Sequence, residues 1–423
     1  FAELRTVRAL ARVATTSAVV VEAQQGAVVG AVALTPILYR FFRTAHADPN
    51  AVVQTQWVAW GARTYDQTQA QRALDRVVEH HDMLRVRATT AERLTILERD
   101  AVPIEAALPP DGGFGLDLKR GPIVRAVWSD ERRALGLVVH HVAVDAVSWH
   151  VLAEDLLAAY DGEPLPPKTT SFQTWAARLD VAPRAAPIAL RPTAFCRTLR
   201  LALDGIDAHG VDAVLLTALA LAWRDVVGAD ALVVDKEGHG RHPFADDLDV
   251  GRTVGWFTTL YPVSLRVGAA DDGAALLAVR AQLAATPPEA GFDHFRRHHA
   301  THAAAPVLYN YLGEGHDWGG DDDDDDDAPF GAQGSSHELN AVRAKDGTLV
   351  VRWTATADAD ALVAAFAARA RAVAALPVRG GSGFALLRSD GRAGRTPLWL
   401  VHALSGSVQP YGGMAAAVAE RPV

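Results

Sequence analysis

The stretch LGLVVHHVAVDAVSWHVLAEDLLAAY, residues 135–160, joins an apolar run to a pattern of helical period. The run before His140 and His141 is uninterrupted, which is typical of a buried strand. Asp145 follows at the start of the helical pattern, where a carboxylate can cap free N–H groups. Side chains at a strand end commonly border ligand sites in α/β folds. The pattern leaves open whether His141 is catalytic or a core histidine bonded to a carboxylate.

A second stretch, ALVVDKEGHGRH at residues 231–242, repeats this arrangement with a carboxylate. A short apolar strand ends at Glu237, and glycines in the following loop let the backbone turn sharply and approach a ligand. An imidazole and a carboxylate that face each other across a cavity form a natural acid/base pair for moving a proton. Spacing alone does not show that they face each other. Downstream, Tyr309 and Asn310 lie in PVLYNYLGE, where they could line a substrate tunnel.

Strand-like runs alternate with helical runs through most of the chain. The alternation predicts an α/β fold with helices packed on sheets. Strands are expected at residues 134–140, 231–235, 259–267, 306–312 and 348–356. Helices are expected at residues 69–85, 148–160, 212–227 and 360–376. A proline-rich stretch, residues 179–193, is expected to cross between two lobes.

Composition excludes several classes of function. The net charge of −9 includes seven aspartates, Asp321–Asp327, so the rest of the 423-residue chain carries −2 and offers no basic footprint for nucleic acid. Cys196 is the single cysteine, so an internal disulfide is impossible and a cytoplasmic location is expected. The apolar stretch at residues 17–38 is broken by Glu22, glutamines and glycines, so we expect no membrane span.

Other clusters of ionisable residues predict no metal site. The aspartate run lacks the glycine and the closing glutamate of a calcium loop, so we expect a solvated loop. His298 and His302 are four residues apart, but no glutamate accompanies them as in zinc hydrolases, and a surface or linker helix is expected. The pair His80 and His81 falls in the helix expected at 69–85, where we interpret it as structural.

Several stretches together resemble the condensation-domain superfamily of nonribosomal peptide synthetases. HHVAVDAVSW, residues 140–149, resembles its His-His-x-x-x-Asp motif, and the VSW continuation is similar to the epimerization branch. EGHGR, VGWFTTLYPV and YNYLGE resemble later motifs of that branch in the expected order. LTPILYRFF, EHHDMLR and SSHELNAVRAKDGTLVVRWT resemble its opening and closing stretches. The resemblance spans about residues 31–376.

The resemblance implies a two-lobed fold in which each lobe is like chloramphenicol acetyltransferase, with a tunnel between the lobes. A carrier domain's 4′-phosphopantetheine arm would present an aminoacyl or peptidyl thioester to His141 and Glu237. These two residues are the expected catalytic acid/base pair of an L-to-D epimerase, an isomerase that needs no cofactor for chemistry and no metal. The expected supporting residues are His140, Asp145, Ser148, Trp149, Gly238, His239, Arg241, Tyr309 and Asn310. Among them, Asp145 is expected to hold the loop and His140 to be structural.

The resemblance also implies a domain order. We expect the last helix of a carrier domain and a linker at residues 1–30, an N-lobe at 31–180 and a C-lobe at 181–376. A linker at 377–394 would lead to a truncated thioesterase start at 395–423, where PLWLVHALSGSV resembles that domain's opening strand and loop. Upstream carrier and downstream thioesterase domains are therefore the expected partners. Ala146 departs from the superfamily's usual glycine, and His242 stands where an acidic residue is common.

Two alternatives to epimerization remain. A condensation domain would use the same second histidine to join two carrier-bound substrates, but EGHGR and YNYLGE argue against it. A noncatalytic docking platform would recruit partner enzymes to the carrier, and such domains have usually lost the active histidine or its surroundings. No Gly-x-Ser-x-Gly elbow occurs in the chain, so a thioesterase nucleophile of that kind is excluded.

Overall fold

The computed structural model describes residues 23–377, apart from 45, 91–92, 106, 108–113, 180, 182–192, 204, 243, 269–270, 300, 302, 315–334 and 345. Helices and strands alternate along this part of the chain, so the predicted α/β class is confirmed. The aspartate run, most of the proline-rich crossing, the carrier-like opening helix and the thioesterase-like end lie outside the described residues. No described helix is both long enough and apolar enough to cross a membrane.

The chain divides into two compact units. The first contains the described residues up to Leu199, with Val233–Val263 and Ala285–Ala359. The second contains Arg200–Leu232, Ser264–Ala284 and the described residues from Asp360 on. The first unit holds every residue that the sequence analysis assigned to the catalytic pair or to its support.

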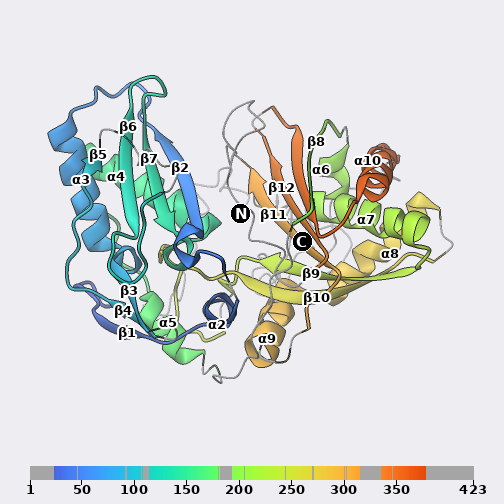
Figure 1. The fold of residues 1–423 in the computed structure, drawn as a ribbon, viewed down its shortest axis with the longest axis horizontal. Helices are drawn as coiled ribbons and strands as arrows, with labels where there is room; N and C mark the ends of the chain where they lie inside the picture. The colour runs from blue at the N-terminus through green and yellow to red at the C-terminus, as the bar shows by residue number, and fades with distance from the viewer. Residues whose placement is uncertain are drawn as a thin grey trace, which may run out of the picture. The chain divides into compact units, whose positions relative to one another are not determined.

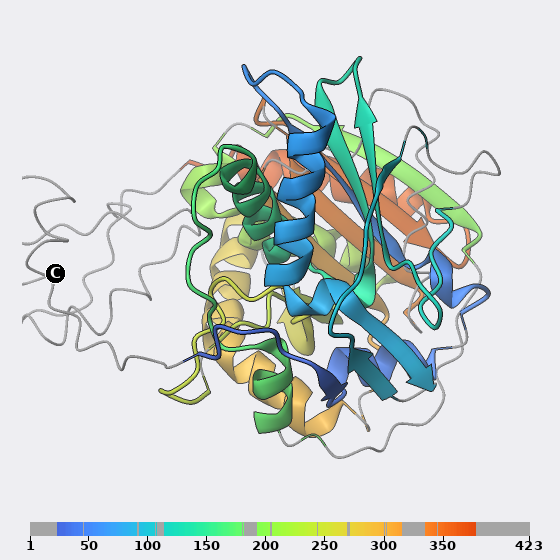
Figure 2. The ribbon, with the colours of Figure 1, turned by 90° about the vertical axis from the view of Figure 1, so that its left-hand side faces the viewer.

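A four-stranded sheet in the first unit carries the two histidines. Its order is β2 (Val53–Ala59), β7 (Ala134–His140), β6 (Val124–Ser129) and β5 (Ile104–Glu105). Every residue of β7 is buried, because β7 pairs with β2 on one side and β6 on the other. Helices α3 (Gln67–His80) and α4 (Ala146–Tyr160) lie side by side next to this sheet (Figures 1 and 2). The apolar run at 134–140 thus became a buried strand ending at His140, as predicted.

Shorter elements complete this part of the unit. A three-stranded antiparallel sheet has the order β1 (Gly30–Val32), β4 (Arg93–Ile96) and β3 (Val86–Thr90). Helix α2 (Pro36–Arg43) precedes β2 in the sequence, and helix α5 (Phe172–Arg178) follows α4. Thr35 accepts a hydrogen bond from the Leu38 N–H, and Pro36 begins α2, so cap and proline together fix where the helix starts. Three short 3-10 turns are Pro49–Ala51, Asp82–Arg85 and His141–Ala143.

A six-stranded sheet carries Glu237. Its order is β10 (Thr259–Arg266), β9 (Ala231–Gly238), β11 (Val307–Glu314), β12 (His337–Arg343), β13 (Leu349–Ala355) and β8 (Phe195–Leu201). β9, β11 and β12 run parallel, with Asp235, Leu308 and Glu338 in one row. The carboxyl ends of these three strands therefore meet at one edge of the sheet, close to which Glu237 lies. Helix α9 (Pro288–His298) precedes β11.

The second unit is mainly helical and consists of α6 (Ile206–His209), α7 (Val211–Val227), α8 (Asp272–Ala285) and α10 (Asp360–Ala374), with short stretches of strand. α7 packs against α10. The central residues 213–222 of α7 are all buried, which explains why its sequence is apolar on all sides. Arg369 on α10 donates hydrogen bonds to Asp225 and to Asp272, which ties three segments of this unit together.

One predicted helix boundary was wrong. The helix expected at 69–85 ends at His80, because the guanidinium of Arg85 turns back and donates to the carbonyl oxygens of Val78 and Glu79 at 2.6 and 2.7 Å. His81 therefore lies outside α3. The helix expected around His298 is α9, which ends at that residue. His302 itself lies outside the described residues.

Candidate active site

The loop after β7 gives the two adjacent histidines different environments. His140 is completely buried, and its Nε2–H donates to the Pro49 carbonyl oxygen at 2.9 Å. Its Nδ1 accepts from the Val142 N–H at 3.2 Å. Burial lowers the pKa of His140 to about 4, so the ring is neutral near pH 7. Both ring nitrogens are engaged by the backbone, as suits a side chain that holds this turn in place.

His141 has the opposite tautomer. Its Nδ1 lies 2.9 Å from the Val144 carbonyl oxygen, which can only accept, so Nδ1 carries the hydrogen. Its Nε2 lies 2.9 Å from the side-chain amide nitrogen of Gln54 on β2. Trp256 lies against the ring, with 4.1 Å between ring centroids. Burial lowers the pKa of His141 to about 4, although Asp145 nearby opposes this. The ring is therefore a neutral base whose lone pair is on Nε2.

Asp145 joins the histidine loop to the segments around Glu237. As the N-cap of α4 it accepts from the N–H and the hydroxyl of Ser148, at 2.8 and 2.7 Å. Its other oxygen accepts from the Phe257 N–H at 3.1 Å. The Arg241 guanidinium donates to Asp145 at 2.8 Å, and both side chains are buried. Buried ion pairs need such additional hydrogen bonds to offset their desolvation.

Arg241 and Ser148 extend this network to the segment that precedes β10. Arg241 also donates to the carbonyl oxygens of Val250 and Thr253, at 2.9 and 2.7 Å. Its guanidinium lies 4.0 Å from the centroid of the Phe257 ring. The Ser148 hydroxyl accepts from the Gly255 N–H at 3.1 Å. Asp145, Ser148 and Arg241, which were expected as supporting residues, thus meet in one hydrogen-bonded network that connects these loops.

Glu237 lies one residue before the end of β9 and is partly buried. Burial raises the pKa of its carboxyl group to about 8, and the nearby Glu338 carboxyl group adds to this rise. Arg40 and Lys236 act in the opposite direction. Near pH 7 Glu237 is therefore largely protonated and can donate a proton.

Two glycines shape the loop that follows Glu237. A side chain at Gly240, where φ is +65°, would place its Cβ 1.7 Å from the Phe257 carbonyl oxygen. At Gly238 a Cβ would lie 3.0 Å from the Thr259 hydroxyl oxygen. The glycines thus let this loop pack closely against the backbone at Phe257, whereas the expected approach to a ligand stays a prediction. His239, between them, is exposed, and its Nδ1 accepts from the Arg241 N–H at 3.0 Å.

The strand register separates Tyr309 from Asn310. Tyr309 is aligned with Lys236 in the parallel pairing of β11 with β9, and Asn310 and Glu237 are the residues that follow them on the two strands. Because neighbouring residues of a strand point to opposite faces, Asn310 shares the face of Glu237 and Tyr309 does not. Tyr309 is completely buried, with the Lys236 amine 6.0 Å from its ring centroid. The two residues therefore lie on opposite faces of β11, and their expected place in a tunnel stays a prediction.

Sequence reasoning did not single out three residues of the site. Gln54 and Trp256 contact His141, and Glu338 influences Glu237. Glu338 is 3% exposed, accepts from the Asn340 side chain at 2.8 Å, and has a second carboxyl oxygen that accepts nothing from the described residues. Burial raises the pKa of Glu338 to about 7. Trp256 and Glu338 lie within motifs that were quoted, whereas no local pattern marks Gln54.

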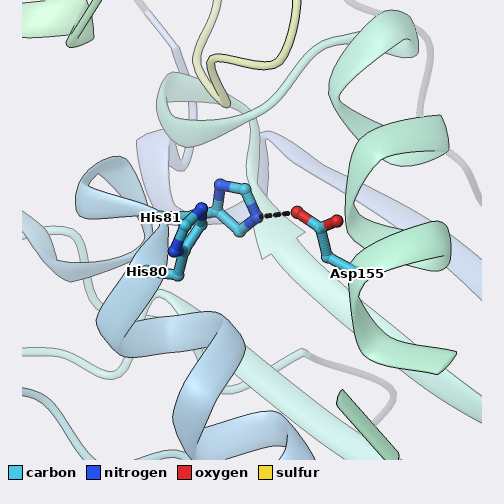
Figure 3. Close-up of side chains that lie close together, drawn as sticks. All are labelled: His80, His81 and Asp155. Atoms are coloured by element: carbon cyan, nitrogen blue, oxygen red, sulfur yellow. Dashed lines mark hydrogen bonds and ion pairs between the residues drawn. The ribbon is translucent and has the colours of Figure 1, made fainter. Parts of the chain in front are cut away.

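One further cluster, formed by His80, His81 and Asp155, is the only group among the described residues with spacing that could suit a metal ion (Figure 3). The His81 Nε2 and Asp155 already form a buried hydrogen bond at 2.9 Å. The other Asp155 oxygen accepts from Arg252 at 2.6 Å, which places a fixed cation beside the carboxylate. With these atoms already paired, the cluster acts as a buried connection between the end of α3 and α4.

The chain is similar to known peptide synthetases. The condensation domain family model matches residues 93–182. Chondramide synthase from Chondromyces crocatus is 31% identical over 386 residues, and a linear gramicidin synthase from Brevibacillus parabrevis is 31% identical over 391. Each match covers 74% of this chain but only 10% and 8% of the relative. N-(5-amino-5-carboxypentanoyl)-L-cysteinyl-D-valine synthase from Amycolatopsis lactamdurans is 30% identical, with 69% and 9% covered. The chain thus spans about a tenth or less of these relatives.

Solved structures share its fold. The epimerization domain from the third module of tyrocidine synthetase B aligns with a TM-score of 0.66 and 24% identity, covering 83% of this chain and 98% of that one. The X-domain from teicoplanin biosynthesis aligns with a TM-score of 0.58 and 16% identity, covering 84% and 98%. These likenesses confirm the predicted fold class. Together with the motifs, these matches show that the chain belongs to the condensation-domain superfamily of nonribosomal peptide synthetases, as predicted.

Proposed function

We propose that this chain epimerizes the α-carbon of an aminoacyl or peptidyl thioester carried on the 4′-phosphopantetheine of a carrier domain. The observation that carries the proposal is a pair of groups with opposite protonation. His141 is a neutral base with its lone pair on Nε2, and Glu237 is a carboxylic acid with a pKa of about 8. His141 lies in the turn after β7 and Glu237 at the end of β9, and the buried pair of Asp145 and Arg241 joins the segments that follow them.

These groups suit a proton transfer at a carbon atom. The thioester acidifies the α-proton, so the Nε2 of His141 can remove it and leave the C–H electron pair in an enolate. The Glu237 O–H can then give its proton to the opposite face of that carbon. The products are an imidazolium, a carboxylate and the inverted α-carbon. Exchange of protons with water returns the enzyme to its starting state, and no metal or redox cofactor enters this balance.

The protonated carboxyl group of Glu237 favours epimerization over peptide-bond formation. Joining two carrier-bound substrates requires a residue that assists an attacking amine, for which His141 alone would suffice. Peptide-bond formation therefore offers no reason to keep the Glu237 carboxyl group protonated near neutral pH. Inversion requires both partners, and Glu237 with Glu338 beside it supplies the second one. The name of one relative's product, which contains D-valine, agrees with this direction.

The test is exchange of the α-proton with heavy water. A panel of L-aminoacyl thioesters, on pantetheine and on a holo carrier domain, is incubated with the chain, and deuterium content and chirality are measured. We expect deuterium and a mixture of D and L product. His141→Ala and Glu237→Gln should each reduce inversion by at least about 10²-fold, the usual scale of acid–base catalysis.

The controls change the same residue types elsewhere. His150→Ala and Glu131→Gln alter exposed side chains and should leave the rate unchanged. If no loaded carrier gives exchange above the background of the His141→Ala variant, the epimerase proposal is wrong. An amide product with a second aminoacyl carrier would then indicate condensation, and stable binding of a partner enzyme without turnover would indicate docking.

A further inference from the structure

Gln54 occupies an unusual place beside the proposed base. It lies on β2, the edge strand that pairs with β7, opposite Val139 in the register. One end of its side-chain amide lies 2.8 Å from the Trp149 indole nitrogen, and the other lies 2.9 Å from the His141 Nε2. Three side chains from β2, α4 and the loop after β7 thus form a continuous chain of hydrogen bonds.

The chemistry of the groups fixes every donor and acceptor in this chain. An indole N–H can only donate, so the Gln54 atom facing Trp149 is its oxygen. The atom facing His141 is then the amide nitrogen, which can only donate, so the His141 Nε2 must accept. The contact between Nδ1 and the Val144 carbonyl oxygen requires the same tautomer independently. Two separate contacts therefore agree on a neutral ring with its lone pair on Nε2.

We propose that Gln54, oriented by Trp149, is a positioning residue that keeps His141 in its base form. A donor aimed at Nε2 stabilises the lone pair and opposes protonation at that atom. In the unloaded site the amide occupies the place that the substrate's α-C–H must take, so binding of the thioester displaces Gln54 from Nε2. The inference rests on the proposed function for its catalytic meaning, but the tautomer that it assigns does not depend on any activity.

The titratable and charged neighbours of His141 are held by contacts of their own. His140 precedes it on the same turn and is engaged at both nitrogens by the backbone. Asp145 at the start of α4 favours the charged ring, but its charge is matched by the buried guanidinium of Arg241. Trp256, which lies against the ring, carries no charge. A change at Gln54, whose amide nitrogen lies 2.9 Å from Nε2, therefore alters a direct contact of that atom.

The decisive variant is Gln54→Glu. A carboxylate still accepts from Trp149, but at Nε2 it can only accept, so it favours the imidazolium. An opposite charge at hydrogen-bond distance should raise the pKa of His141 by about 1–3 units. Because the neutral ring is the active form and residue 54 contacts Nε2 only before the thioester binds, the acid limb of the kcat/KM profile, which reports the free enzyme, should move to higher pH by the same amount. The rate at alkaline pH should be changed much less.

Trp149→Phe is the second variant. It keeps an aromatic ring but removes the indole N–H, so the Gln54 amide is free to turn its oxygen toward Nε2. This should also favour a hydrogen on Nε2 and move the acid limb of the kcat/KM profile to higher pH. If the contacts act as one chain, adding Trp149→Phe to Gln54→Glu should have a smaller effect than Trp149→Phe alone. Gln56→Glu is the matched control, because it puts the same charge two residues along β2, where Gln56 donates to the Trp57 carbonyl oxygen.

The direct measurement is the ¹⁵N NMR spectrum of histidine-labelled chain, with the His141 signals identified by comparison with His141→Ala. In the parent we expect a protonated Nδ1 and an unprotonated Nε2 between about pH 6 and 8. In Gln54→Glu we expect the pKa of His141 to be higher by about 1–3 units. A parent ring protonated on Nε2, or a Gln54→Glu variant with an unchanged pKa, would overturn the proposal. If the tautomer is as expected but no substrate exchanges its α-proton, the proposed function fails and the assignment of Gln54 stands.

Discussion

Burial acts on His141 and Glu237 in the same physical way but leaves them in opposite chemical roles. It disfavours the charged form of each group, so the pKa of the imidazole falls to about 4 and the pKa of the carboxyl group rises to about 8. One residue becomes a base that is unprotonated near pH 7 and the other an acid that is protonated. Between these two values a single pH supports both, and that window is where we expect activity to be greatest.

Replacing Glu338 by glutamine should narrow this window from its alkaline side. The Glu338 carboxyl group raises the pKa of Glu237, while Arg40 and Lys236 lower it. Without the charge of Glu338 the two cations act with less opposition, so the pKa of Glu237 falls. The protonated acid is then lost at lower pH, and the alkaline limb of kcat moves down from about 8.

The profile of kcat against pH for Glu338→Gln and the parent measures this shift, with Glu131→Gln as a control for the loss of an exposed carboxylate. The acid limb, which reports His141, should stay where it was. An alkaline limb that stays in place in Glu338→Gln would show that Glu338 does not set the acidity of Glu237.

At this scale the sequence indicated some residues of the site and missed others for a clear reason. His141 and Glu237 follow apolar runs that mark strand ends, so their residue types and positions could be picked out together. Gln54 lies on an edge strand, and its partner Trp149 is far away in the sequence. Pairing across strands depends on register, which a single apolar or polar pattern does not define. Tyr309 and Asn310 were grouped because they share a motif, although neighbouring residues of a strand point to opposite faces.

At the scale of elements, the loop that leaves β9 determines where Glu237 and Arg241 lie. Gly240→Ala should destabilise the fold by about 3 kcal/mol or more, because it combines a positive φ with a clash against backbone that cannot move aside. The Cβ would lie 1.7 Å from the Phe257 carbonyl oxygen. Chemical denaturation monitored by tryptophan fluorescence measures the loss, and inversion should fall with it because the loop must shift.

Gly162→Ala separates the cost of a positive φ from the cost of a clash with the backbone. Gly162 also has a positive φ, +80°, but no atom lies within 4 Å of the position that a Cβ would take there. It should cost only the conformational part, about 1–2 kcal/mol, and should leave inversion unchanged. Equal losses in stability for the two variants would mean that the approach of the loop to Phe257 is not close in solution.

Elements themselves were well predicted where an apolar period runs over a whole strand or helix. The strand at 134–140 and the helix at 360–376 agree with β7 and α10 to within two residues. The helix at 69–85 was predicted too long, because its periodicity continues while Arg85 closes the end of α3 from outside. A side chain that satisfies the last carbonyl groups from beyond the helix leaves no signal in the periodicity.

At the scale of the molecule, the histidine loop and the Glu237 loop are about a hundred residues apart in sequence and belong to different sheets. Asp145 on one and Arg241 on the other form a buried, hydrogen-bonded pair. The sequence marked both as supporting residues from their motifs but could not show that they meet. The expected domain order remains a prediction, because the segments assigned to the carrier and thioesterase ends lie largely outside the described residues.

An acid and a base that act on opposite faces of one carbon make a distinctive prediction for the whole enzyme. In the parent, thioesters of either enantiomer should exchange their α-proton and reach the same D:L ratio. Glu237→Gln leaves His141 able to remove and return a proton on its own face, so one enantiomer should still exchange with heavy water without inversion. His141→Ala should leave exchange only from the other enantiomer. Mass and chiral analysis of separate D and L substrates decides the matter: if both variants retain exchange from the same enantiomer, or neither retains any, the two residues do not serve opposite faces.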